Sequence, residues 1–489
     1  MAIDTIDQPV FAAEGEGAEV AAVQGRAEDL REGSPIYRAQ VGRFGLGPPV
    51  AASARRLGEM RDFGRELGTA EAVPVATRTD LATLAAIVRR SNSDVARAAE
   101  AVVRADIVRD NAGLALAPRV GGDLEYARVN EDIDRTAGAA GSDGTFDRAS
   151  VRVEATQPIL DLGALAARDA AEAEQGVARA SYAAQTQAAI FDLTAAYLRG
   201  LEAQQRTEFT TRRLERVRAQ IAAEARLLDA GRSVGAARSV LDVERGSAEA
   251  DIALLAQDLG AVLSQIARLS GQAVDALEPL DYGAGAFAAA EPIETYLARA
   301  MEANPLMQQR RLETLRQRDL YREAVARDFA PRLEGFARGE LEQEDGAPGR
   351  IGNDTDDYSV GLRLSVPIFN RAGTGYAHRV AESDYRDAAL AEVSLQRELE
   401  AEIRTLVRRI EDGRSAVVGA ERSLRAAREL VQAERAAVAV GQAAPVAVLA
   451  REIQLLRVEE SLLLRRYEVL RARARLAFLT GSDPVEALL

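Results

Sequence analysis

The sequence predicts a mainly α-helical fold with a small β portion, built from two copies of one structural repeat. Three observations lead to this prediction: apolar residues recur at intervals of seven, short segments alternate between apolar and polar residues, and several motifs occur twice at nearly one spacing. Composition agrees, because 47% of the 489 residues are apolar and only 4% are aromatic. This balance of Ala, Leu and Val favours long helices.

Intervals of seven mark the predicted helices. Apolar residues recur at this spacing in the segments Leu81–Val102, Leu255–Leu269 and Leu449–Leu470. Such a stripe is typical of helices packed as coiled coils. The segment from Ala372 to Val440 contains no proline, so it predicts one helix of about 70 residues, or about 100 Å in length.

Alternation with a period of two marks the predicted strands. In the clearest case, Asp357–Val366, every second residue from Tyr358 onward is apolar and the residues between are mostly polar. Its length is about that of a tilted strand that crosses a membrane. Strands are predicted near residues 118–129, 149–157, 331–341 and 357–366. The third is the weakest, because Phe336 falls on its polar face.

Polar segments rich in Asp, Gly and Asn join the strands of each pair. They cover residues 130–148 and 341–356. Segments of this composition predict exposed loops.

The motifs at the ends of the strands occur twice. Ala117-Pro118-Arg119-Val120 is echoed by Ala330-Pro331-Arg332-Leu333, and Pro158-Ile159-Leu160-Asp161 by Pro367-Ile368-Phe369-Asn370. The pairs Ala230-Gly231 and Val440-Gly441, and Leu269-Ser270-Gly271 and Leu479-Thr480-Gly481, lie 210 residues apart. A tandem duplication explains four such echoes at nearly one spacing.

The duplication sets the expected domain organisation. Residues 1–78 show little periodicity and predict an N-terminal extension that is largely disordered. The first repeat is expected over residues 79–280 and the second over 281–489. Four prolines are expected at strand and helix junctions, since proline fixes φ and lacks an N–H; they are Pro118, Pro158, Pro331 and Pro367.

Charge and residue content argue against several function classes. Lys+Arg number 62 and Asp+Glu 76, for a net charge of −14, so nucleic-acid binding is not expected. The chain has no cysteine and one histidine, His378, in a polar turn where we expect a solvated side chain. Neither a thiolate nor a His-rich metal site can form. Without a Gly-rich phosphate loop or a Gly-x-Ser-x-Gly elbow, we expect no enzyme activity, no cofactor and no metal.

The membrane-related features point in different directions. No uninterrupted run of about 18 apolar residues is present, so no transmembrane helix is expected, while a β-barrel remains open. The residues from Met1 onward show no basic segment followed by an apolar core. No secretory signal peptide is therefore expected in the sequence as numbered.

In their order, the two Ala-Pro junctions, the two Pro-Ile strand exits and the two Gly-containing turns resemble the TolC family of outer-membrane efflux proteins, from about Thr79 to Leu489. The resemblance implies a homotrimer in which four strands per chain close a twelve-stranded barrel in the outer membrane, continued by a helical barrel through the periplasm. It implies a passive channel for efflux or type I secretion. The implied partners are outer-membrane lipid, an inner-membrane transporter and a periplasmic adaptor, which would contact the turns at Gly231 and Gly441.

The resemblance also implies acidic residues that narrow the periplasmic end just after each Gly-containing turn. Asp242 falls at this place in the first repeat, and we expect it to line a constriction. In the second repeat, alignment on Val448-Leu449 puts Ala450 there, whereas a fixed spacing of 210 puts Glu452 there. The alternative for Asp242 is a solvated acid on a helix surface.

A second function class also fits part of the sequence. A soluble coiled-coil scaffold without transport activity is favoured by the sevenfold stripes and by the lack of a signal peptide. It does not explain the alternation in Asp357–Val366 or the duplicated strand exits. The channel is therefore the leading hypothesis.

Overall fold

The computed structural model describes residues 79–133, 142–229, 235–282, 284–345, 354–367 and 376–488. The expected N-terminal extension, residues 1–78, lies outside the described residues. So do Gly231 and the Ile-Phe-Asn part of the second strand exit.

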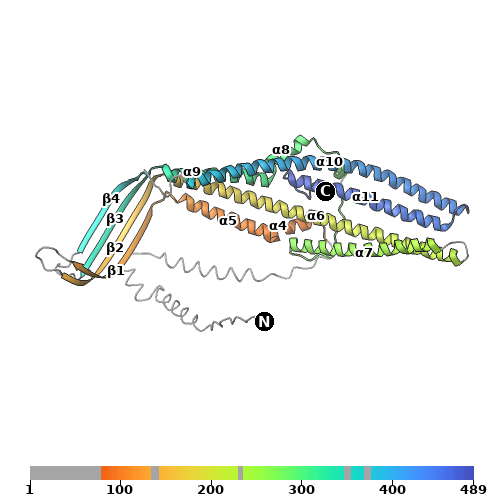
Figure 1. Ribbon diagram of the computed structural model, residues 1–489, viewed down its shortest axis with the longest axis horizontal. Coiled ribbons are helices and arrows are strands. Elements are labelled where there is room, and N and C mark those ends of the chain that lie inside the picture. Colours follow the sequence, from red (N-terminus) through yellow and green to blue (C-terminus); the bar gives the residue numbers. More distant parts are fainter. Residues whose placement is uncertain are drawn as a thin grey trace, which may run out of the picture. The chain divides into compact units, whose positions relative to one another are not determined.

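The order of elements repeats itself along the chain (Figure 1). The first repeat comprises α4 (Leu81–Ser91), α5 (Ser93–Gly113), β1 (Arg119–Ile133), β2 (Ser142–Asp161), α6 (Leu162–Asp229) and α7 (Gly235–Ser270). After η1 (Ala284–Phe287), the second comprises α8 (Ile293–Ala303), α9 (Pro305–Phe329), β3 (Arg332–Asp345), β4 (Asp354–Ser365), α10 (Ala377–Ala439) and α11 (Pro445–Leu479). The predicted fold class is confirmed, including the duplication.

The first long helix of each repeat sets its length. Helix α6 has 68 residues and α10 has 63, which correspond to about 100 and 95 Å. Each pairs with the helix that follows it, α7 or α11, and α11 also packs against α6. A small residue allows a close approach in the second pair, because a Cβ at Gly413 of α10 would lie 2.7 Å from Val469 Cγ2 of α11.

The apolar stripe that begins at Leu81 does not form one continuous helix. Asn92 interrupts it with an extended backbone (φ −69°, ψ 125°) and caps α5, where its Oδ1 accepts hydrogen bonds from the amides of Asp94 and Val95. An Asn side chain competes for backbone amides in this way and so begins a new helix. The stripe continues across the break, since Val88 and Val95 are both buried.

The second repeat contains the same break at Asn304. Its Oδ1 accepts from Met307 N at 3.0 Å, and its Nδ2 donates to Leu479 O at 2.9 Å. Asn92 Nδ2 donates in the same way to Leu269 O at 3.0 Å. The paired helices α6 and α7 form the first helical hairpin, and α10 and α11 form the second. Each buried Asn thus holds the C-terminal end of the second helix of a hairpin, α7 or α11. The duplication therefore extends to this pair of side chains.

The main apolar core forms where the middle of α6 meets α4, α7 and α11. Tyr197 lies at its centre, fully buried, with its hydroxyl 2.6 Å from Glu278 O and 3.2 Å from Thr79 O. Burial raises the pKa of Tyr197, so this hydroxyl stays protonated and donates. A second core joins α8 and the start of α9 to α10 and α11.

The four strands form one antiparallel sheet in the order β1-β2-β3-β4 (Figure 1). They are longer than the alternation predicts and extend into both segments expected to be loops, so that Asn130 pairs with Thr145 and Glu342 with Thr355. Backbone pairing continues there because it needs no apolar face, and apolar alternation marks only part of each strand.

Three of the four prolines lie beside the strands that they were expected to bound. Pro118 directly precedes β1, Pro331 directly precedes β3, and Pro367 follows β4 by two residues. The expectation for Pro158 was wrong. It lies within β2, which continues to Asp161, at a register shift between Pro158 and Leu160. A bulge is one of the few places where a strand tolerates proline.

Helix α7 contains a segment, Arg238–Ser270, that is long and apolar enough to cross a membrane by length and composition alone. No transmembrane helix was expected from the sequence, because that expectation required an uninterrupted apolar run. In α7 charged residues interrupt the apolar ones, so the helix does not meet that requirement. Only 17% of its most apolar stretch is buried. The core helix of a soluble protein meets the same criterion.

Candidate functional site: an amphipathic sheet and a charged helix seam

One face of the sheet is apolar and exposed. In register, Val120 of β1, Ala155 of β2, Ala337 of β3 and Val360 of β4 form one row. Large apolar side chains on this face are 50–89% exposed; they are Val120, Leu124, Tyr126, Val153, Leu341, Tyr358, Val360, Leu362 and Leu364. A contiguous apolar surface of this kind marks a site that contacts a partner or a membrane.

The opposite face carries ion pairs that cross between strands. Arg152 and Glu340 are 2.6 Å apart, Arg338 and Glu154 are 3.0 Å apart, and Arg363 and Glu334 are 2.7 Å apart. Cross-strand pairs of opposite charge stabilise a sheet. Because removing charges from water is costly, this face must stay in contact with water. The sheet therefore separates an apolar side from a wet side.

Phe336, which falls on the polar face, is accommodated there by a glycine. It lies opposite Gly361, where an added Cβ would be 2.9 Å from Phe336 Cζ. The Arg363 guanidinium carbon lies 5.0 Å from the ring centroid, within the range of a cation–π contact. Phe336 is thus covered locally and does not interrupt the apolar face.

The apolar band runs obliquely across the sheet. Register places Asp123, Arg152, Glu340 and Asp357 in one row. Residue 123 is the centre of the β1 band, but the centre of the β4 band is residue 361, four residues from 357. This offset of four residues, at about 3.4 Å per residue, builds up over the three strand spacings from β1 to β4, at about 4.8 Å each. The band therefore lies parallel to a membrane plane only when the strands tilt by about 45° from the membrane normal. Strands of membrane barrels tilt by about 35–45°.

Both edges of the sheet lack a partner among the described residues. Strand β1 pairs only with β2, and β4 only with β3. Unpaired edges are not tolerated in lipid, because their amide and carbonyl groups find no water there. A sheet of this kind can enter a membrane only when other strands pair with both edges.

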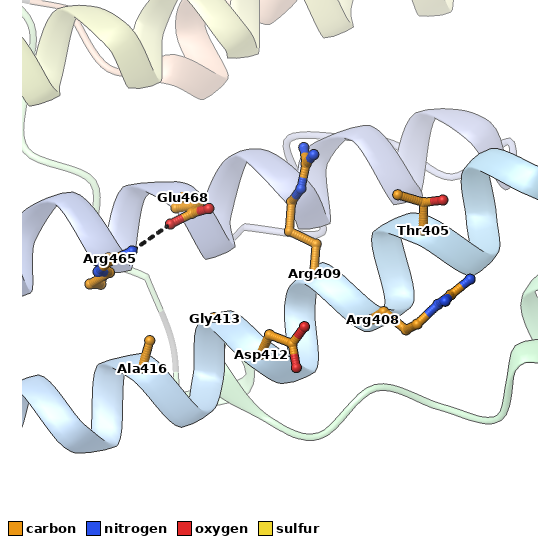
Figure 2. Close-up of a pocket in the computed structure, with 8 residues that line it drawn as sticks. All are labelled: Thr405, Arg408, Arg409, Asp412, Gly413, Ala416, Arg465 and Glu468. Atoms are coloured by element: carbon orange, nitrogen blue, oxygen red, sulfur yellow. Dashed lines mark ion pairs between the residues drawn. The ribbon is translucent and has the colours of Figure 1, made fainter.

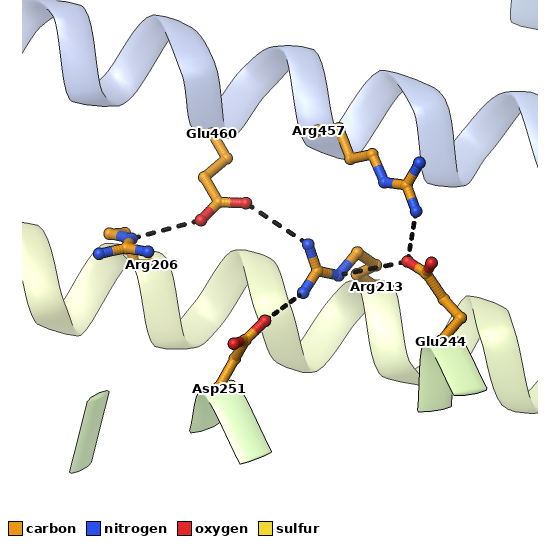
Figure 3. Close-up of polar contacts among 6 residues, drawn as sticks. All are labelled: Arg206, Arg213, Glu244, Asp251, Arg457 and Glu460. Carbon is orange, nitrogen blue, oxygen red and sulfur yellow. Dashed lines mark hydrogen bonds and ion pairs between the residues drawn. The ribbon is translucent and has the colours of Figure 1, made fainter. Parts of the chain in front are cut away.

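Ion pairs also connect the second hairpin to the first. Figure 3 shows this helix seam, which consists of Arg206 and Arg213 on α6, Glu244 and Asp251 on α7, and Arg457 and Glu460 on α11. Arg213, only 13% exposed, lies 2.9 Å from Asp251 and 3.7 Å from Glu460. Arg457 pairs with Glu244 at 2.5 Å and Arg206 with Glu460 at 3.3 Å. Helix α11 is therefore held electrostatically by both long helices of the first repeat.

The two acids considered for a constriction differ in their surroundings. Among the described residues, Asp242 forms ion pairs only with arginines of its own helix, Arg245 at 3.4 Å and Arg238 at 3.9 Å. Glu452, 14% exposed, pairs with Arg216 of α6 at 3.2 Å and with Arg435 of α10 at 2.6 Å. Glu452 thus joins helices, while a role for Asp242 at a constriction stays a prediction.

The turn at Gly441 ends α10. Gly441 has φ +76°, its amide donates to Val438 O at 3.0 Å, and the Gln442 amide donates to Ala437 O at 2.8 Å. This is the Schellman geometry that favours glycine after a helix. The corresponding turn at Gly231 lies outside the described residues. Adaptor contacts at either turn stay a prediction.

The expectation of a solvated His378 was wrong. Its side chain is 21% exposed, and its Nδ1 lies 3.1 Å from the Asp328 carboxylate. The start of α10 lies beside the end of α9, which the local sequence around the histidine does not reveal. Within the described ranges, no group of three or more His, Asp or Glu side chains has an arrangement that would hold a metal.

A surface groove lies between α10 and α11 (Figure 2), with a volume of about 480 Å³. Its lining carries both signs of charge: Arg408, Arg409 and Asp412 on α10, and Arg465 and Glu468, which pair at 3.5 Å, on α11. The groove is open and lined by charged side chains, unlike the enclosed and mostly apolar sites that bind small molecules.

A duplicated chain with an amphipathic antiparallel sheet and paired helices of about 100 Å has the architecture of the TolC-like outer-membrane channel proteins. The chain belongs to the outer membrane efflux protein family, whose model matches residues 84–272 and 296–482. One matched segment falls in each of the two repeats.

Solved structures show the same fold at low sequence identity. The outer membrane protein VceC from Vibrio cholerae matches with a TM-score of 0.69 at 16% identity, over 82% of this chain and 96% of that one. The Campylobacter jejuni CmeC outer membrane channel matches with a TM-score of 0.66 at 14% identity, over 82% and 85%. The open state of the Neisseria gonorrhoeae MtrE outer membrane channel matches with 0.64 at 16%, over 82% and 89%. A search of curated proteins finds no match.

Proposed function

We propose that this chain is one protomer of a homotrimeric outer-membrane channel that passes efflux substrates without reacting with them. Three sheets form a twelve-stranded barrel in the outer membrane, and the helices form a tunnel in the periplasm. A periplasmic adaptor and an inner-membrane transporter complete the path, and the transporter supplies the energy.

The exposed apolar face of the sheet carries the proposal. Tyr358 and Val360 are 89% and 83% exposed in the single chain, and burying such side chains is worth about 1.5–3 kcal/mol each. A bilayer covers the whole face at once. The ion pairs of the opposite face, such as Arg152–Glu340, then line a wet interior. A soluble scaffold would leave the apolar face in water.

Strand tilt and free edges support closure by several copies. A tilt of about 45° matches that of membrane barrels, and both edges, which are free among the described residues, need further strands, which neighbouring copies can supply. Family membership supports efflux as the transported function.

Mass and conductance test the proposal together. Three copies of 52.4 kDa give about 157 kDa, and we expect this protein mass by light scattering in detergent. The same sample should produce stepwise currents in planar bilayers. A monomer that stays soluble in buffer without detergent and gives no current would contradict the channel and favour the scaffold.

Barrel closure has a sharper test, because the chain contains no cysteine and every introduced thiol is unique. Continuing the oblique band by one strand places Val360 opposite Leu124 or Tyr126 of the neighbouring copy. We expect Val360→Cys combined with Leu124→Cys or Tyr126→Cys to form disulfide-linked dimers and trimers, since facing strand residues have the required Cβ separation. Val360→Cys with Val153→Cys, on the inner strand β2, is the matched control and should not link copies. Equal linking by both pairs would refute this register.

A further inference from the structure

The two edges of the sheet carry charged side chains on the polar face. Among the described residues, these charges are Arg119, Asp123 and Glu125 on β1, and Asp357 and Arg363 on β4. Asp123 is exposed and forms no ion pair within the part of the chain that the structure describes. Arg363 is 49% exposed and pairs with Glu334 through Nη1. Its guanidinium has further N–H groups that can bind a second carboxylate.

Inside the sheet, the ion pairs of the polar face follow the register of the strands. Among the described residues, four of these pairs join direct partners in register, and one joins residues a diagonal step apart. The direct pairs are Arg152–Glu340, Arg338–Glu154, Arg363–Glu334 and Arg332–Asp161, and the diagonal pair is Arg148–Glu342. When the edges of two copies join, their charges are expected to meet by the same rule.

The slope of the apolar band limits how β4 of one copy can join β1 of the next. The strand order makes this joint antiparallel. Four residues of offset over three spacings are about 1.3 residues per spacing, so one more spacing places residue 361, the centre of the β4 band, about 1.3 residues beyond residue 123 of β1. Because polar face must meet polar face, the partner of residue 361 is residue 123 or 125, and 125 is the nearer. Arg363 then lies directly opposite Asp123.

The other charges of the two edges agree with this register. It places Glu125 opposite Gly361, which carries no charge. A slide of four residues would put Arg363 opposite Arg119 and Asp357 opposite Glu125. Like charges directly opposite each other destabilise a pair of strands, so that slide meets two repulsions.

A slide of two residues gives the competing register. It puts Asp123 opposite Gly361 and so gives Asp123 no directly opposite cation. On the apolar face it pairs Asp356 with Arg128, which already lies 3.6 Å from Asp147. It also departs further from the slope of the band, because it shifts the strands by four residues over four spacings, whereas the band gives about 5.3 and the first register gives six.

We propose that Arg363 of one copy pairs with Asp123 of the next copy, and that this pair fixes the register in which β4 joins β1. Across the joint the signs of charge then alternate, from Glu334 and Arg363 of one copy to Asp123 and Arg152 of the next. The partner that these edges fit is a second copy of this chain. The inference rests on the proposed function and adds the side chains by which one protomer recognises another.

Disulfide formation separates the two registers, because the chain contains no cysteine. In the proposed register Val360 lies opposite Tyr126, and in the competing one it lies opposite Leu124. Under mild oxidation of the full-length protein in detergent, Val360→Cys with Tyr126→Cys should link copies faster than Val360→Cys with Leu124→Cys, since a diagonal pair lies farther apart. Equal or faster linking by the Leu124 pair overturns the proposal and leaves the channel intact. If neither pair links copies, the closed barrel fails, and the proposal with it.

A double-variant cycle tests the charge pair itself. Asp123→Asn and Arg363→Gln should each lower the temperature at which half of the trimer dissociates. The double variant should lower it no further than Arg363→Gln alone, because the two side chains share one interaction. Asp123→Asn with Asp357→Asn is the matched control, since Asp357 lies on the same strand as Arg363 but six residues away, and these two effects should add. Additive effects of Asp123→Asn and Arg363→Gln, with the Tyr126 pair still linking copies, would overturn the ion pair and leave the register to backbone and apolar contacts.

Discussion

The two hairpins of long helices arise from the same repeat but have different surroundings. Helix α11 packs against both α10 and α6, and its side chains Val469 and Leu470 are fully buried. Helix α7 leaves Val240, Val243 and Leu254 60–73% exposed. Duplication thus gave the second hairpin an inner place within the chain and left the first hairpin with an apolar surface to be covered by something else.

The largest expected effect comes from truncating a leucine in each hairpin and comparing the two losses of stability. Leu470→Ala on α11 should lower the free energy of unfolding by about 2–5 kcal/mol, because Leu470 is fully buried and its loss leaves a cavity. Leu254→Ala on α7 is the control, with an expected cost of at most about 0.5 kcal/mol in a single chain. Thermal unfolding followed by circular dichroism measures both. An equal cost for Leu254→Ala would show that α7 is buried in the assembly.

The buried asparagines test how far the two repeats are equivalent. Asn92→Ala and Asn304→Ala should each cost about 1–3 kcal/mol, because each loses a helix cap and leaves the carbonyl of Leu269 or Leu479 without its donor. Asn→Asp keeps the cap but buries a carboxylate oxygen beside the Leu269 or Leu479 carbonyl oxygen, so it should cost at least as much as Ala. Proteolysis rates and melting temperatures measure both pairs. A large effect at only one site would show that the repeats are anchored differently.

The helix seam should be weaker than the core but stronger than a surface pair. Arg213→Met should cost about 1–2 kcal/mol, less than a fully buried pair, because water still reaches the seam. Asp242→Asn, which removes pairs within α7 alone, should cost under about 0.5 kcal/mol. The Arg213 effect should shrink at high salt. If salt leaves it unchanged, packing of the Arg213 side chain and not its charge holds the seam.

The smallest expected effect concerns Glu411 of α10, in the second repeat. The hydrogen bond from the Ala290 amide, at 2.6 Å, and the neighbouring Arg414 hold the pKa of Glu411 below its usual value. A lowered pKa stabilises the fold above the unfolded value of about 4.3, and this stabilisation is lost as pH falls through the lower folded value. The protection of the Ala290 amide, measured as its exchange rate relative to the intrinsic rate at each pH, should therefore fall in acid. Glu411→Gln should abolish this fall; an unchanged fall would assign it to another group.

Much of the fold could be predicted because the periodicity of side chains reports directly on the environment of a helix or a strand. Tyr358 to Leu364 alternate because one face is apolar, and Pro118, Pro331 and Pro367 mark the ends of strands. The helix break at Asn92 escaped prediction, since its flanking apolar residues keep the sevenfold spacing across it. The full strand lengths escaped because polar residues pair through the backbone as well as apolar ones do.

The same distinction between local patterns and distant contacts applies to the candidate site. Its apolar face follows from local alternation in the sequence. The partners of Arg213, Glu452 and His378 depend on helices brought together from distant parts of the chain. No spacing within one helix encodes these contacts, so only the structure shows that Glu452 joins helices while Asp242 pairs within its own.

The cations on the polar face of the sheet are all arginines, since the chain contains no lysine. Arginine keeps its charge at any pH at which the protein is folded, whereas lysine would lose its charge in strong alkali. Alkali therefore leaves the cations of this face as they are. An anion on the wet side of the sheet meets the same positive charges in neutral and in alkaline solution.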